Sequence, residues 1–87
     1  MPSRRVTIAS PTGLHARPAK LLTEAARKQP LVIRIGRAED HLVDASSILA
    51  VMSLGVRAGE EVLLTAEGDQ ADRVLAELAE LLSHDDT

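Results

Sequence analysis

His15 and Arg17 are the residues of this chain whose types and spacing could carry out chemistry. They lie in the segment Gly13-Leu14-His15-Ala16-Arg17-Pro18-Ala19, where Gly13 favours a turn and Pro18 suits the first turn of a helix. Unpaired backbone N–H groups and the positive end of the helix dipole meet at such a helix start, and together they favour bound anions. A neutral imidazole is a nucleophile near neutral pH, and a guanidinium can hold phosphoryl oxygens. The segment therefore predicts that His15 accepts a phosphoryl group.

The residues that would hold this phosphoryl group follow His15 directly: Ala16, Arg17 and Pro18. We expect Pro18 to fix the backbone rather than to take part in the chemistry. Each candidate also has an ordinary interpretation. A histidine before a helix can be a solvated loop residue, and an arginine in a first helical turn can serve solubility alone.

The composition argues against several classes of protein. The 87 residues carry a net charge of −3 and no Phe, Tyr or Trp. Nucleic-acid binding is therefore disfavoured, because the chain has no excess of positive charge to neutralise phosphates and no aromatic side chains to stack on bases. The absence of Cys excludes a disulfide framework, and His41 and His84 have no partner at metal-ligand spacing, so no metal site is expected. No apolar run approaches ~20 residues and no signal peptide is evident, so we expect a cytoplasmic protein without a membrane segment.

Two hydrophobic periods divide the chain into strands and helices. Alternation with a period of two predicts strands at 5–9, 31–35, 41–44 and 61–66, with Leu31, Ile33 and Ile35 buried in the second. Helical spacing predicts helices at 16–28, after Ser46 or Ser47, and along the apolar stripe Ala71, Val74, Leu75, Leu78, Leu81 and Leu82. The order β-α-β-β-α-β-α indicates a single α+β domain spanning 1–87, with three helices on one face of a four-stranded, mainly antiparallel sheet.

Two segments of the chain resemble one known family. Gly13–Ala19 resembles the active-site signature of HPr, the histidine-containing phosphocarrier family of the bacterial phosphoenolpyruvate:sugar phosphotransferase system. Ser47-Ile48-Leu49-Ala50-Val51-Met52-Ser53-Leu54-Gly55 resembles the regulatory-site helix of that family. Two such motifs at the family's spacing, in a chain of family length, are far more specific than either alone.

The resemblance implies both a fold and a function. The fold is an open-faced β-sandwich. Enzyme I, charged from phosphoenolpyruvate, would phosphorylate Nδ1 of His15, and a sugar-specific enzyme IIA would then receive the phosphoryl group. The protein would be a monomeric relay rather than an independent enzyme, with no organic cofactor, no metal and no small-molecule pocket of its own.

An apolar docking surface is expected on the short helix after Ser47. That helix cannot bury all of its apolar residues, and Leu49 and Met52, three positions apart, share a face. An exposed apolar pair beside a charged site suits partner docking, and the matching HPr positions contact enzyme I and enzyme IIA, although core packing is the alternative. Arg27 could meet acidic partner surfaces, with solvation as the simpler explanation.

Ser47 matches the serine that a dedicated kinase phosphorylates in many Gram-positive relatives. The resemblance thus implies an HPr kinase/phosphorylase and a catabolite regulator as further partners, while a helix cap is the alternative role. Ser46 stands where the family commonly has lysine, and this departure bears on kinase recognition rather than on transfer at His15.

Other functions remain compatible with the sequence. A paralogue in a nitrogen-related or dihydroxyacetone phosphorelay would use the same histidine with different partners. Regulatory relatives typically lack the histidine, and an independent enzyme would need a second acid or base near His15. The sugar is not readable, because its specificity lies in the acceptor.

Overall fold

The computed structural model describes residues 2–83, so the expectation for His84 lies outside the described residues. The elements follow the predicted order: β1 (Ser3–Thr7), α1 (Ala16–Arg27), β2 (Val32–Gly36), β3 (Leu42–Asp44), α2 (Ile48–Ser53), β4 (Glu61–Glu67) and α3 (Ala71–Ser83). Within residues 2–83, no helix is long and apolar enough to cross a membrane.

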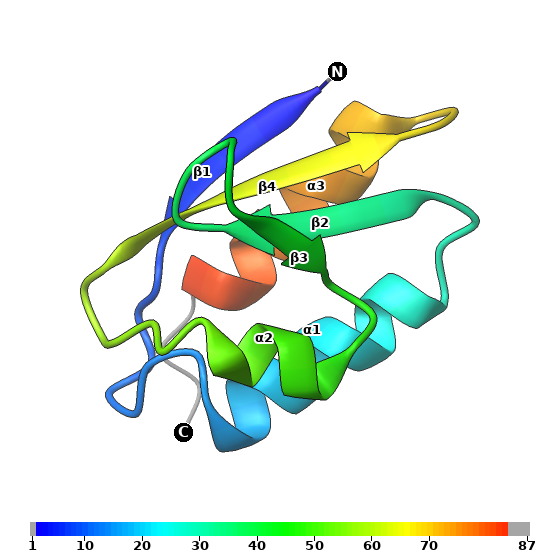
Figure 1. Cartoon of the computed structure of the whole chain (residues 1–87). Helices are drawn as coiled ribbons and strands as arrows, with labels where there is room; N and C mark the ends of the chain where they lie inside the picture. Colours follow the sequence, from blue (N-terminus) through cyan, green and yellow to red (C-terminus); the bar gives the residue numbers. More distant parts are fainter. Residues whose placement is uncertain (1, 84–87) are drawn as a thin grey trace.

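The strands form one four-stranded sheet in the order β1-β4-β2-β3, and each neighbouring pair is antiparallel. The three helices lie together on one side of this sheet (Figure 1). The expected α+β architecture, an open-faced β-sandwich, is therefore confirmed. Its first strand pairs with its last, so the segments that precede α1 and β4 are brought side by side.

The core between sheet and helices is filled with aliphatic side chains. Val62, Leu64 and Ala66 of β4 alternate toward the helices and are fully buried, as are Leu75 and Leu78 of α3. Without aromatic side chains, a core this small is held together by close aliphatic packing.

The central strand β4 is buried on its other face as well. Leu63 and Thr65 point away from the helix side yet are only 3% and 5% exposed. Leu63 lies between Arg5 and Gly36 in the sheet register, and Glu39 of the β2–β3 connection lines a pocket together with Thr65. This connection passes over the outer face in Figure 1. The two-residue period predicted the inner face, whereas burial of the outer face depends on the neighbouring strands and this connection.

Strand boundaries differ slightly from the prediction. β1 begins and ends two residues earlier than the predicted range 5–9, although Val6 and Ile8 are buried as expected. Leu31 precedes β2 and is half-buried against the core rather than buried within a strand. β2 extends to Gly36, because a Cβ there would lie 1.9 Å from the carbonyl oxygen of His41 and only glycine permits this close pairing.

Candidate functional site

His15 is the residue that precedes α1, as the sequence indicated. Its backbone is extended, with φ −147° and ψ 162°, and its side chain makes no capping hydrogen bond. The residue is exposed, and the imidazole has no hydrogen bond or ion pair within residues 2–83. The ring is thus accessible to a partner and is not held by neighbouring groups.

The backbone just after His15 is strained. Ala16, the first residue of α1, has a φ of 50°, in the left-handed region that favours glycine. A residue with a Cβ pays roughly 1–2 kcal/mol for this conformation, so the surrounding structure must enforce it. Ala16 and Arg17 are in the first turn, whose N–H groups lack intrahelical acceptors, whereas Pro18 has no N–H to offer. Only the first two can therefore donate to an anion from the backbone.

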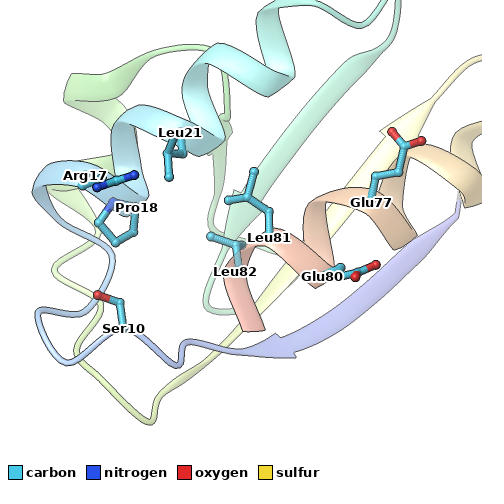
Figure 2. A pocket seen from close by; sticks show the side chains of 8 residues that line it. All are labelled: Ser10, Arg17, Pro18, Leu21, Glu77, Glu80, Leu81 and Leu82. Atoms are coloured by element: carbon cyan, nitrogen blue, oxygen red, sulfur yellow. The ribbon is translucent and has the colours of Figure 1, made fainter. Parts of the chain in front are cut away.

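Arg17 lies at one end of a cavity of about 430 Å³ between the start of α1 and the end of α3. Figure 2 shows its side chain at one side of the cavity, with Leu21, Leu81 and Leu82 between it and the glutamates of α3. The guanidinium has no hydrogen bond or ion pair within residues 2–83, so no described contact holds it away from a phosphoryl group on His15. This cavity could not be predicted from the sequence, because residues from distant segments line it.

The loop before His15 rests on the segment between α2 and β4. The amide of Leu14 donates to the Val56 carbonyl at 3.0 Å. Gly13 has a φ of 74°, and a Cβ there would lie 2.4 Å from the Val56 oxygen. Both the conformation and the close approach therefore require glycine at this position.

A second set of contacts closes the turn at the beginning of the loop. The amide of Gly13 donates to the Ser10 carbonyl at 2.9 Å, and the hydroxyls of Ser10 and Thr12 are hydrogen-bonded at 3.0 Å. Ser10 is buried and also lines the cavity beside Arg17.

Ser47, rather than Ser46, caps α2. The Ser47 hydroxyl accepts a hydrogen bond from the Ala50 amide at 3.3 Å. Ser46 instead donates to the Asp44 carboxylate from its hydroxyl at 2.7 Å and from its amide at 2.9 Å, which lowers the pKa of Asp44. Arg27 Nε donates to the Ser46 carbonyl at 3.0 Å, so the end of α1 is tied to the start of α2.

The two residues of the expected docking pair differ in exposure. Leu49 is 79% exposed, whereas Met52 is half-buried and packs against the core. Leu49 is therefore the apolar side chain that α2 presents most openly.

Ser47 and His15 lie at opposite ends of α1. The Arg27–Ser46 contact places Ser47 near the last turn of α1, whereas His15 precedes its first turn. A helix of 12 residues is ~18 Å long. A group attached to Ser47 therefore cannot touch His15 and would act through the surface between them.

Among residues 2–83, no group of three or more His, Cys, Asp or Glu side chains is arranged to hold a metal ion. His41 is exposed beside Asp40, with His41 Nε2 and Asp40 Oδ2 3.9 Å apart, and it lies in the β2–β3 connection.

Comparison with known proteins identifies the family. The family model described as "PTS HPr component phosphorylation site" matches residues 2–84. The phosphocarrier protein HPr of Haloferax volcanii is 49% identical over 81 residues, covering 92% of this chain and 91% of that protein. A multiphosphoryl transfer protein of Xanthomonas campestris pv. campestris is 42% identical over 72 residues, which cover 83% of this chain and 8% of that protein.

Comparison with solved structures points to the same family. The crystal structure of the phosphocarrier protein HPr from Bacillus anthracis superposes with a TM-score of 0.85 at 33% identity, covering 93% of this chain and 95% of that one. With the fold, the two motifs and the sequence match all in agreement, this chain belongs to the HPr family of phosphocarrier proteins of the phosphotransferase system.

Proposed function

We propose that the protein receives a phosphoryl group on His15 from enzyme I and passes it to a sugar-specific enzyme IIA. The observation that carries this proposal is the exposed, unbonded imidazole at the start of α1, within a chain that matches the HPr family along its length. We further propose that residues 1–87 form one monomeric carrier domain that acts in the cytoplasm.

The chemistry is one of attack and release at a single nitrogen. The neutral ring attacks phosphorus with the lone pair of Nδ1, and the bond from phosphorus to the donor breaks as the new N–P bond forms. The amides of Ala16 and Arg17, together with the Arg17 guanidinium, then hold the phosphoryl oxygens until the acceptor attacks.

Phosphorylation by enzyme I tests this assignment. Incubation with enzyme I and radiolabelled phosphoenolpyruvate should give an acid-labile, base-stable label on the wild-type protein and no label on His15→Ala. Arg17→Ala should be labelled about tenfold more slowly, the equivalent of losing one hydrogen bond to a charged group. His41→Ala, which removes another exposed histidine, is the matched control and should be labelled normally. Label that persists on His15→Ala would place the site elsewhere.

The same assay distinguishes the phosphorelays that share this chemistry. Loading by the enzyme I of the sugar system, followed by transfer to an enzyme IIA, supports the sugar relay. Loading only by a nitrogen-related or dihydroxyacetone-pathway donor would show that the chain is a paralogue.

For regulation, we propose Ser47 as a site of phosphorylation by an HPr kinase/phosphorylase, and the modified surface as a ligand for a catabolite regulator. Its support is the family resemblance and the position of Ser47 at the start of α2, beside Arg27. A phosphate there would add about −1.5 to −2 charges next to the surface of Leu49, Met52 and Arg27 that we propose for docking. Peptide mapping after incubation with the kinase and ATP should find the phosphate on Ser47. A phosphate on Ser46 or Ser53 would contradict the assignment.

A further inference from the structure

Arg37 connects the β2–β3 loop to the end of α2. Its Nη2 donates to the Gly55 carbonyl at 2.9 Å and to the Leu54 carbonyl at 3.3 Å, and its Nε reaches the Leu54 carbonyl at 3.4 Å. These carbonyls follow the last turn of a helix, where acceptors lack intrahelical donors. The guanidinium therefore satisfies groups that α2 leaves open.

The same guanidinium is paired with Glu60. Nη1 donates to Glu60 Oε2, and Nη2 lies 3.4 Å from Oε1. Glu60 Oε1 also accepts from the Arg57 amide at 2.7 Å, and the Glu60 amide donates to the Arg57 carbonyl at 3.1 Å. The hydrogen bond between the two side chains raises the pKa of Arg37 and, with the hydrogen bond from the Arg57 amide, lowers the pKa of Glu60. Arg37 thus binds the beginning of segment 54–60, Glu60 lies at its end, and the pair between them holds the two ends together.

Segment 54–60 in turn holds both ends of the loop that carries His15. Before the loop, the Ile8 amide donates to the Glu60 carbonyl and the Gly59 amide donates to the Ile8 carbonyl, each at 2.9 Å. After it, the Leu14 amide donates to the Val56 carbonyl at 3.0 Å. In Figure 1 this yellow-green segment lies beside the blue loop that leads into α1. A continuous set of hydrogen bonds therefore runs from Arg37 to the residue next to His15.

The location of this network matters more than its strength. Arg37 and Glu60 have side chains 45% and 35% exposed, and an ion pair this exposed adds little to global stability. The loop, however, leads into the strained backbone of Ala16, which keeps its φ of 50° only if its surroundings are fixed. Loss of the network should therefore disturb the geometry at His15 before it unfolds the protein.

We propose that Arg37 is a positioning residue for phosphoryl transfer, which with Glu60 fixes segment 54–60 and so the backbone that presents His15. The proposal rests on the assignment of His15 as the phosphoryl acceptor. It concerns a residue outside both family motifs, and its role depends on contacts between three separate parts of the chain: the β2–β3 connection, segment 54–60 and the loop before His15.

Steady-state kinetics with enzyme I, in which this protein is the varied substrate, test the role. Arg37→Met keeps the aliphatic stem and removes every donor. We expect kcat to fall about three- to tenfold, because small displacements of a reacting group are costly, and KM to change by less than about twofold. Arg37→Lys, which keeps the charge but cannot bond two carbonyls and a carboxylate together, should recover part of kcat. Amide exchange at Leu14 should become faster in Arg37→Met.

Two further variants separate positioning from general damage. Arg73→Met is the matched control, because it removes another exposed, ion-paired arginine, which pairs with Glu77 at 4.0 Å on α3 and has no hydrogen bond or ion pair with segment 54–60 among residues 2–83. It should keep the wild-type kcat. Glu60→Gln should also lower kcat, and the double variant with Arg37→Met should be no slower than Arg37→Met alone, because both residues act through the same segment.

The outcomes can be told apart. A wild-type kcat in Arg37→Met, an equal loss in Arg73→Met, or a loss that matches the unfolded fraction measured by urea denaturation would each overturn the positioning role. If wild-type protein accepts no phosphate from any enzyme I, or if His15→Ala is still labelled, the function assigned to His15 fails instead.

Discussion

Ala16 shows how a single residue can hold strain next to a reactive group. Its left-handed backbone follows His15 directly, and Gly13 on the other side of His15 is also left-handed. The sequence places glycine at one of these positions, where Val56 approaches, and alanine at the other, where the residue is exposed. Conformation alone would favour glycine at both, so the alanine has a cost that the fold must offset.

Ala16→Gly should relieve that strain. We expect the free energy of unfolding, measured in urea, to rise by about 0.5–1 kcal/mol, because relief of the left-handed strain outweighs the extra chain entropy of glycine. Transfer from enzyme I should slow, since the backbone at His15 becomes freer. Ala76→Gly, at an exposed position within α3, is the control and should lose about 1 kcal/mol of stability. A comparable loss in Ala16→Gly would show that the conformation is not strained.

Among the elements, α2 differs most from its sequence-based description. Its apolar residues were expected to be divided between core and surface, with Leu49 and Met52 both on the exposed side. The structure buries Val51, half-buries Met52 and exposes Leu49, because a helix of six residues that packs on both α1 and β3 presents only a narrow outer face. Docking variants at Met52 would therefore mix loss of contact with loss of packing.

Leu49→Glu is the cleaner test of the proposed docking surface. A side chain that is 79% exposed contributes little to the core, so the free energy of unfolding should change by less than about 0.5 kcal/mol. KM for enzyme I should rise several-fold, because a carboxylate replaces an apolar contact. Val32→Glu is the matched control, since Val32 is also an exposed apolar residue, at 51%, and lies on β2. An equal effect of both variants on KM would remove Leu49 from the docking surface.

The elements and the position of His15 could be predicted from the sequence because both depend on local patterns. Periodicity located the strands and helices to within a few residues, and the Gly13–Ala19 segment placed His15 before α1. The support beneath that segment could not be predicted. Val56, Glu60 and Arg37 come from other parts of the chain, and only the pairing of β4 with both β1 and β2 brings them to the loop.

At the scale of the whole fold, two carboxylates among residues 2–83 link stability to pH. Hydrogen bonds from Arg37 and the Arg57 amide lower the pKa of Glu60, and those from Ser46 lower the pKa of Asp44. A carboxyl group whose pKa is lower in the folded than in the unfolded state stabilises the fold above its unfolded pKa. That contribution is lost as the pH falls through the folded pKa.

Urea denaturation between pH 7 and about pH 3 should therefore show stability declining below about pH 5. Glu60→Gln should reduce the steepness of this decline, because the variant has no carboxylate to protonate at that position. Glu67→Gln is the control, since the Glu67 side chain makes no hydrogen bond or ion pair within residues 2–83, and it should follow the wild-type curve. Identical slopes in Glu60→Gln and wild type would show that the Arg37–Glu60 pair does not contribute to acid sensitivity.

The length of α1 has a consequence for how much of this carrier a bound partner can contact. A typical protein interface covers about 800 Å² on each side, which is broad enough to span the ~18 Å between the two ends of that helix. On the proposed assignments, a single docked partner contacts the phosphoryl group on His15 at one end and the regulatory phosphate on Ser47 at the other in the same encounter. No conformational change then has to pass through the carrier, which can remain rigid while each partner responds to both sites directly.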